Sequence, residues 1–157
     1  MDYCNALLYG MSDRLMCRLQ SVENTAVRLV TGPRRCDHIT PILRQLDWVP
    51  VRQRVLFRIA VLVFQCLAGQ APSYLSDDCQ PVSDSRPRRL RSSVSLSCVV
   101  RRAYNSYGDR CFATAGPRVW NSLPAELQQC SSLRQFKRCL KTFLFGSWDY
   151  TALCDSL

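Results

Sequence analysis

The chain has 157 residues, 47% of them hydrophobic, which suits one domain with a sizeable buried core. Its formal net charge is +9, and 19 of its 21 basic residues are arginine, whose guanidinium group pairs well with phosphate oxygens. The unbroken apolar run in its most hydrophobic segment, residues 59–64, is far shorter than the ~18 residues that a bilayer requires, which excludes a membrane-spanning helix there.

Ten cysteines and one histidine are present, and no two cysteines form a C-x-x-C pair. The first 20 residues, which include Asp2, Asp13 and Arg14, lack the continuous apolar core of a signal peptide. Cys36 and His38 are neighbours, but two ligands do not make a zinc site. We therefore expect reduced thiols in an intracellular protein, nuclear or cytoplasmic and not secreted, with no metal and no cofactor.

An amphipathic helix is expected at residues 13–30. Its apolar stripe consists of residues at alternating spacings of four and three, namely Leu15, Leu19, Val22, Ala26 and Leu29. We expect this stripe to be buried and Arg14, Arg18 and Arg28 to lie on the outer face. Ser12 suits the N-cap position, and the Thr-Gly-Pro run at 31–33 ends the helix.

A second, short helix is predicted from Thr40, as its N-cap, and Pro41, at the first helical position. Leu43 and Leu46 would form its buried side. We expect the next aromatic residue, Trp48, to fill the corner before the following helix.

The most informative stretch is residues 51–68, where we expect one long central helix between Pro50 and Gly69. At 100° per residue, Arg54, Arg58 and Gln65 fall in one narrow stripe, and nearly every other position is apolar. A surface helix has a wide polar face, so this helix should be buried on most sides with the other segments packed around it.

Residues 76–93 differ in character, because they hold two prolines, five serines and four arginines with almost no large apolar side chain. We expect a basic loop here. The β-branched residues and partial alternation at 94–102 predict a strand, against which residues 104–107 would return as a small hairpin.

Further helices are predicted after the hairpin. The first is capped by Asp109 and interrupted at Gly116-Pro117, where we expect a kink or two short pieces. The last begins at Ser132, with Gln135 placed for a capping box. Its apolar side holds Leu133, Phe136, Leu140, Phe143 and Leu144, and its basic side holds Arg134, Lys137, Arg138 and Lys141.

Together these elements predict a mostly α-helical fold, a small helical domain around one buried central helix with at most one small β-hairpin. Residues 1–75 would form an N-terminal helical part, and 76–93 the basic loop. Residues 94–145 would form the hairpin and the C-terminal helices, and 146–157 a tail.

Catalytic motifs are missing. The sequence contains no P-loop, no dinucleotide glycine fingerprint and no G-x-S-x-G motif. Asp77 and Asp78 form the only adjacent acidic pair, in a polar loop, whereas two-metal phosphoryl transfer needs carboxylates that converge on rigid elements. We therefore expect no catalytic residue and no enzyme activity from this chain alone.

Five segments occur in an order that resembles a known family. They are DYCNALLYG (2–10), LQSVENTAVRLVTG (19–32), DHITPILRQLDWVPVRQRVLFRIAVLVFQCLAGQAPSYLSD (37–77), YGDRCFATAGPRVWNSLP (107–124) and LRQFKRCLKTFLF (133–145). In combination they resemble the C-terminal region, downstream of the polymerase core, of reverse transcriptases from jockey-like non-LTR retrotransposons. The resemblance covers about residues 2–145.

This resemblance implies a truncated C-terminal fragment of an RNA-directed DNA polymerase. In such enzymes the polymerase aspartates lie upstream in an F/Y-x-D-D motif. Here Asp77 and Asp78 follow Leu75 and Ser76, without the aromatic residue, so no catalytic residue can be assigned. The endonuclease domain and the Cys/His knuckle of some relatives are also absent from this sequence.

The basic residues give the candidate site, a sequence-independent contact with the backbone of RNA or DNA. The candidates are Arg34, Arg35, Arg86, Arg88, Arg89, Arg91, Arg101, Arg102, Arg134, Lys137, Arg138 and Lys141. The alternative is a helical scaffold or protein-interaction module with no nucleic-acid role, whose exposed apolar patch would receive the missing polymerase domain. Neither alternative involves a membrane.

Overall fold

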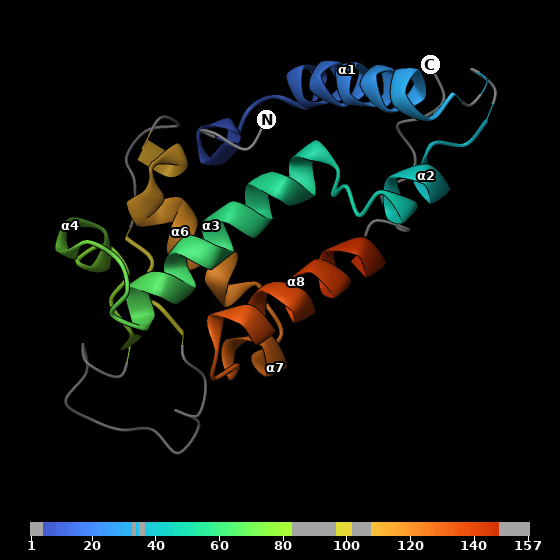
Figure 1. Cartoon of the computed structure of the whole chain (residues 1–157). Helices are drawn as coiled ribbons and strands as arrows, with labels where there is room; N and C mark the ends of the chain where they lie inside the picture. The colour runs from blue at the N-terminus through green and yellow to red at the C-terminus, as the bar shows by residue number, and fades with distance from the viewer. Residues whose placement is uncertain (1–4, 33, 35–36, 83–96, 102–107, 148–157) are drawn as a thin grey trace.

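The computed structural model describes residues 5–32, 34, 37–82, 97–101 and 108–147, and within these ranges the chain is helical without strands (Figure 1). The longer helices are α1 (Asp13–Thr31), α3 (Val51–Leu67), α6 (Phe112–Asn121) and α8 (Leu133–Ser147). Shorter ones are η1 (Asn5–Leu8), α2 (Thr40–Gln45), α4 (Ser73–Ser76), η2 (Gly108–Arg110) and α7 (Ala125–Gln128). The mostly α-helical prediction is thus confirmed.

Helix α3 is the centre of the fold, as the sequence predicted. It runs between α1 and α8, with α6 crossing it (Figure 1), and Arg52 is the one exposed residue among its 17. Gly69 ends it with a φ of 68°, a left-handed conformation that glycine adopts without strain. The predicted polar stripe of Arg54, Arg58 and Gln65 is half-buried.

Three aromatic rings join α3, α6 and α8 in the main core. Phe64 stacks on Phe136 with 4.6 Å between ring centroids, and Trp120 lies at an angle to both rings. Trp120 and Phe136 are fully buried. Gly116 lets α6 approach α3 closely, since a Cβ there would lie 3.1 Å from Val63 Cγ2.

Helix α1 is rotated relative to the sequence prediction. Four residues of the predicted apolar stripe are exposed instead of buried: Leu15, Leu19, Val22 and Leu29. We call these four residues the α1 apolar stripe. The buried side holds Met16, Glu23 and Val27. Two polar interactions explain this orientation: Gln20 accepts a hydrogen bond from the Val51 N–H, and Glu23 pairs with Arg54, both at the N-terminal end of α3. These interactions fix which side of α1 faces inward.

The α2–α3 corner also differs from the prediction. Trp48 is 42% exposed, and a small second core of Val27, Ile39 and Leu43 fills the corner instead. Asp47 has a φ of 58°, and this left-handed turn directs the chain so that Val49, not Trp48, is buried.

Several predicted helix ends were wrong. Thr40 is the first residue of α2, so Ile39 is the N-cap, and α6 begins after Cys111 while Asp109 lies in η2. Helix α6 runs from Phe112 to Asn121 with Pro117 inside it, so the chain does not form two short pieces there. Helix α8 extends through Gly146 to Ser147, two residues into the predicted tail.

The predicted hairpin is not formed by the residues described. Residues 97–99 pair instead with residues 80–82 through one antiparallel bridge between Pro81 and Cys98. Residues 94–96 and 102–107 lie outside the described residues, as do 83–93 of the predicted basic loop and 148–157 of the predicted tail. In the described parts of the chain, every helix is too short or too polar to cross a bilayer.

Replacement of Phe136 by alanine should lower the free energy of unfolding by about 3–5 kcal/mol, because the ring is fully buried against Phe64 and Trp120. Phe143 lies on the same helix and is 38% exposed, so Phe143→Ala is the matched control and should cost less than about 1 kcal/mol. Urea unfolding measures both values, and equal costs would contradict the arrangement of α8.

Candidate nucleic-acid interface

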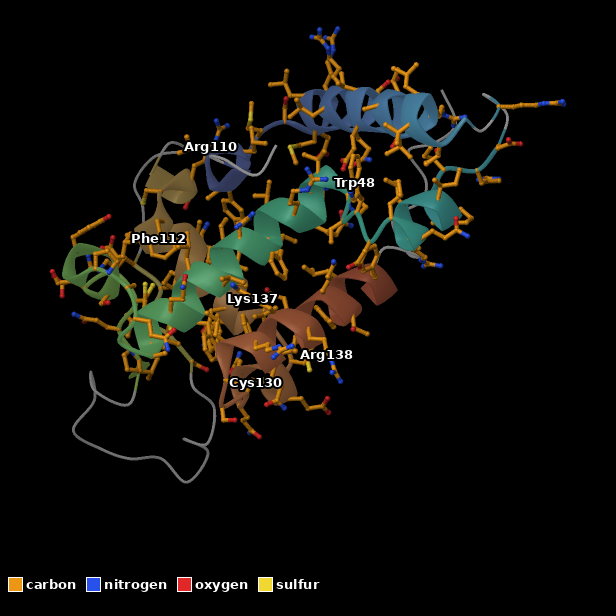
Figure 2. All side chains as sticks on the ribbon, viewed as in Figure 1. Trp48, Arg110, Phe112, Cys130, Lys137 and Arg138 are labelled. Carbon is orange, nitrogen blue, oxygen red and sulfur yellow. The ribbon has the colours of Figure 1, made fainter. Side chains whose placement is uncertain are left out.

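Helix α8 gathers four of the predicted contact residues into one row. Arg134, Lys137, Arg138 and Lys141, the α8 basic row, lie three or four residues apart and therefore on one side of the helix. The first three are exposed, and Lys141 is half-buried. The neighbouring side of the helix is held in the core by Phe136, Leu140 and Leu144. Figure 2 labels Lys137 and Arg138 on this helix.

The start of α8 supports this orientation. The Gln135 backbone N–H donates a hydrogen bond to Ser132 Oγ at 3.3 Å, which is one half of the predicted capping box. Because the helix is fixed at this end and along its apolar side, the basic row is displayed on a rigid element.

The other predicted contact residues are not gathered in the same way. Arg34 is exposed between α1 and α2, far along the chain from the basic row. Arg101 bonds Asp78 Oδ1 at 3.4 Å and the Asp77 carbonyl oxygen at 3.1 Å, so the Asp78 carboxylate offsets its charge. The candidates outside the described residues are Arg35, Arg86, Arg88, Arg89, Arg91 and Arg102.

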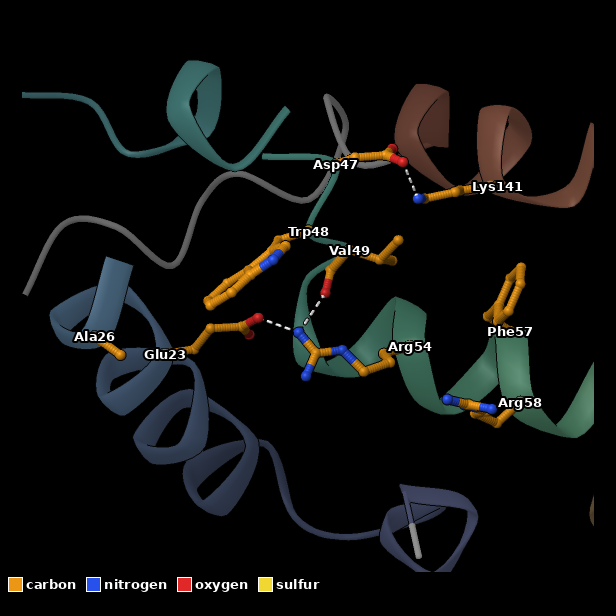
Figure 3. Close-up of a pocket in the computed structure, with 9 residues that line it drawn as sticks. All are labelled: Glu23, Ala26, Asp47, Trp48, Val49, Arg54, Phe57, Arg58 and Lys141. Carbon is orange, nitrogen blue, oxygen red and sulfur yellow. Dashed lines mark hydrogen bonds and ion pairs between the residues drawn. The ribbon is translucent and has the colours of Figure 1, made fainter. Parts of the chain in front are cut away.

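A pocket of about 420 Å³ adjoins the basic row at Lys141 (Figure 3). It lies among α1, the α2–α3 connection, α3 and α8. Its lining residues are Glu23, Ala26, Asp47, Trp48, Val49, Arg54, Phe57, Arg58 and Lys141, and we call it the Trp48 pocket. Three of these residues are basic and two are acidic, so the lining has a small positive charge.

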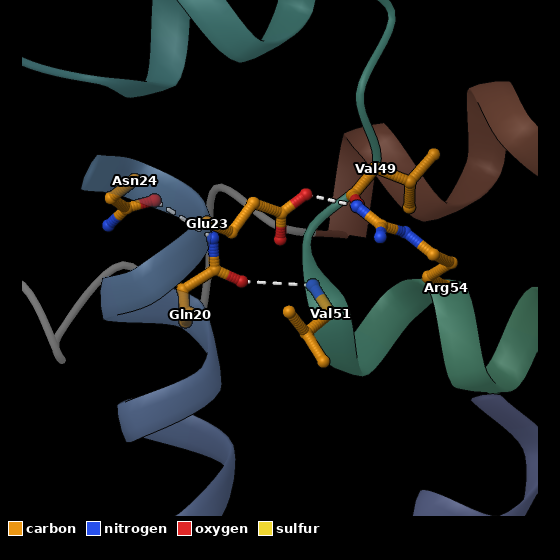
Figure 4. Close-up of polar contacts among 6 residues, drawn as sticks. All are labelled: Gln20, Glu23, Asn24, Val49, Val51 and Arg54. Atoms are coloured by element: carbon orange, nitrogen blue, oxygen red, sulfur yellow. Dashed lines mark hydrogen bonds and ion pairs between the residues drawn. The ribbon is translucent and has the colours of Figure 1, made fainter. Parts of the chain in front are cut away.

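Two ion pairs hold the walls of the Trp48 pocket. At its inner end Arg54 on α3 pairs with Glu23 on α1 and donates to the Val49 carbonyl oxygen at 2.9 Å (Figure 4). The Glu23 side chain is 6% exposed and that of Arg54 is 18% exposed, so this pair is shielded from water. At the rim Lys141 pairs with Asp47, whose side chain is 69% exposed.

A neighbouring bond ties α1 to the start of α3. The Val51 N–H, which helix geometry leaves without a partner in α3, donates to Gln20 Oε1 at 2.9 Å (Figure 4). The Gln20 amide in turn donates to Asn24 Oδ1 at 2.9 Å. The inner end of the pocket is therefore rigid.

The sequence did not identify Trp48, Arg54 and Arg58 as site residues. The sequence contained one indication of them, because Arg54 and Arg58 lie in a helix that is otherwise mostly apolar. A buried arginine requires an acidic or carbonyl partner. What the sequence could not supply is that partner, because Glu23 is 31 residues away in the chain.

A second hollow of about 510 Å³ lies near η1, α3 and η2. It too has arginines in its lining, but Arg52 pairs with Asp13 and Arg118 pairs with Asp109 at 2.9 Å. The aromatic residue in its lining is Tyr9, which is less exposed than Trp48.

Three buried thiols meet near the end of α3. Cys66 and Cys79 are within hydrogen-bonding reach of each other, and Cys98 is close enough to interact electrostatically with Cys66. Burial raises the pKa of all three thiols, that of Cys98 to about 11. Among the described residues, no group of three or more histidine, cysteine, aspartate or glutamate side chains is placed to hold a metal ion.

Comparison with protein-family models, with curated proteins and with solved structures finds no match for this chain. The comparisons therefore supply no activity, substrate or partner. The resemblance to reverse transcriptases depends on the sequence segments quoted above, and the function has to be argued from the geometry of this chain.

The buried thiols should make the protein less stable in alkali. In the unfolded chain a thiol titrates near pH 8.5, whereas Cys98 in the fold keeps its proton up to about pH 11. Between these pH values the Cys98 thiol loses its proton only in the unfolded state, so the free energy of unfolding should fall as pH rises, by on the order of 2 kcal/mol for Cys98.

Urea unfolding at pH 7, 9 and 10 measures this fall. Cys98→Ala should reduce it, while Cys17→Ala, which alters an exposed thiol, should leave it unchanged. The same fall in the wild type and in Cys98→Ala would contradict the effect of burial on the Cys98 pKa.

Proposed function

We propose that the chain is a C-terminal fragment of a jockey-like non-LTR retrotransposon reverse transcriptase that contacts the phosphate backbone of RNA or DNA without catalytic activity of its own. The observation that carries the proposal is the α8 basic row. Its location in the cell would be the nucleus or the cytoplasm, where nucleic acid is present.

The geometry of α8 favours phosphate contact. Four cations lie within the eight residues 134–141, about 10 Å of helix, and α8 contains no acidic residue that would cancel their charge. Asp47 approaches Lys141 alone, so Arg134, Lys137 and Arg138 face solvent without an ion pair among the described residues. Long flexible side chains on one exposed face suit the backbone and do not read bases in a groove.

The acidic residues support a non-catalytic function. Asp78 pairs with Arg101, and the Asp77 carbonyl oxygen accepts a hydrogen bond from the same side chain. A carboxylate neutralised by arginine is a poor ligand for a catalytic metal ion. We therefore expect no primer extension by this chain, even with added Mg²⁺ or Mn²⁺.

The α1 apolar stripe favours a second candidate function, that of a protein-interaction module. Leu29 is 83% exposed and Val22 is 59% exposed, and both lie on the same side of α1 as Leu15 and Leu19. Apolar residues gathered on one helix face are typical of a contact surface. This face would pack against another part of a longer polymerase, and both functions can belong to one chain.

Removal of two charges from the basic row tests the first function. Lys137→Ser with Arg138→Ser should flatten the slope of log affinity against log salt by about 1.4–1.8, since each phosphate contact contributes ~0.7–0.9. Fluorescence anisotropy with a labelled strand, at several salt concentrations, measures the slope.

The matched control removes the same charge from α1. Arg14→Ser with Arg18→Ser alters two exposed arginines far from α8 and should leave the slope unchanged. An equal change in both double variants would indicate a diffuse attraction between the basic protein and any polyanion, and would contradict a defined interface on α8.

The second function predicts concentration-dependent self-association through the α1 apolar stripe. Val22→Glu should weaken this association, because it places a charge in the centre of the stripe. Ser21→Glu adds the same charge to an exposed position that is not three or four residues from any member of the stripe, and it serves as the control. Sedimentation velocity measures the association, and a wild type that stays monomeric at every concentration would refute self-association through the stripe.

A further inference from the structure

We propose that the Trp48 pocket receives one unstacked base of a single-stranded nucleic acid, stacked on Trp48, while the α8 basic row holds the adjoining phosphates. The proposal rests on the proposed nucleic-acid contact and goes further, because it identifies single-stranded RNA or DNA, not a duplex, as the ligand.

Trp48 has the placement of a stacking platform. Its side chain is 42% exposed at the edge of a pocket, because the left-handed turn at Asp47 keeps it out of the α2–α3 corner. Figure 3 shows it beside Val49, with Phe57 on α3 farther along the pocket. A single exposed tryptophan on a convex surface is common and does not indicate a binding site. A tryptophan beside a hollow can stack its ring on a flat ligand.

The size and lining of the pocket suit a base. A volume of about 420 Å³ lies within the range of small-molecule sites and exceeds what one base occupies. Ala26, Val49 and Phe57 provide apolar walls, and Arg58 provides a planar guanidinium group that stacks on bases and donates hydrogen bonds. The acidic groups Glu23 and Asp47 are each paired with a cation.

Lys141 connects the pocket to the basic row. It lines the pocket, and Lys137 and Arg138 lie one helical turn before it on the same side of α8. A strand whose phosphates follow α8 would thus reach the pocket at Lys141 and insert the next base there. A base within a duplex is stacked and paired, so it cannot enter without the cost of being flipped out.

The test uses three fluorescein-labelled ligands of equal length: a mixed-sequence single strand, the same strand annealed to its complement, and a strand of abasic sites. Trp48→Ala should weaken binding of the base-bearing single strand about fivefold or more, and should leave the duplex and the abasic strand unaffected. Its salt slope should not change, because stacking releases no counterion.

Two further variants control for the fold. Trp48→Phe keeps an aromatic ring and should retain most of the affinity. Tyr74→Ala removes an aromatic ring that is 70% exposed on α4, away from the pocket, and should have no effect. Thermal unfolding checks that each variant is folded.

The wild-type protein gives a test that needs no substitution. It should bind the base-bearing single strand at least about fivefold more tightly than the abasic strand. Equal affinity for these two ligands overturns the proposal, as does a Trp48→Ala variant that loses the same affinity for all three ligands or for none. If Lys137→Ser with Arg138→Ser still flattens the salt slope in that case, the backbone contact stands and the base pocket alone is refuted.

Discussion

Burial of helix α3 is the constraint on which the rest of the structure depends. An apolar helix this long is unstable in water unless other elements cover it, and α1, α6, α8 and η1 each cover one side. Close packing on α6 requires Gly116, and packing on α8 is made by the stacked rings of Phe64 and Phe136. The Trp48 pocket lies beside α3 where this helix carries Arg54 and Arg58, between α1, the α2–α3 connection and α8.

The Glu23–Arg54 pair decides how α1 joins this core. A buried ion pair is weak evidence for high stability, because removing two charges from water costs about as much as their attraction returns. It is strong evidence for a fixed arrangement, since either charge without the other would be costly. With Gln20 bonded to the Val51 N–H, the pair fixes the rotation of α1 and leaves the α1 apolar stripe in solvent. The exposed stripe is therefore a consequence of polar bonds made on the neighbouring side of the same helix.

Periodicity within a segment was sufficient to predict much of this fold. It gave the extent of α3, the two faces of α8 and the glycine that ends α3, because each of these depends on residues only a few positions apart. It failed for α1, where the apolar arc lies next to the arc that contains Gln20 and Glu23, and contacts with α3 decide which of the two faces inward. It failed for Trp48 because a residue's own neighbours do not reveal that Val27, Ile39 and Leu43 already fill the corner. The basic row could be predicted and the pocket could not, since four separate elements form its walls.

Asp47 unites the two parts of the candidate site. It is the one non-glycine residue with a positive φ among those described, a conformation that aspartate tolerates better than most residues. Glycine would adopt this turn with less strain, but it would lack the carboxylate that pairs with Lys141 at the rim of the pocket. The same residue thus turns Trp48 outward and positions the last cation of the basic row beside it. An aromatic ring and a cation placed together by one strained residue form a more specific arrangement than a basic surface alone, because under the proposed function stacking and phosphate contact would act on adjacent parts of the same strand.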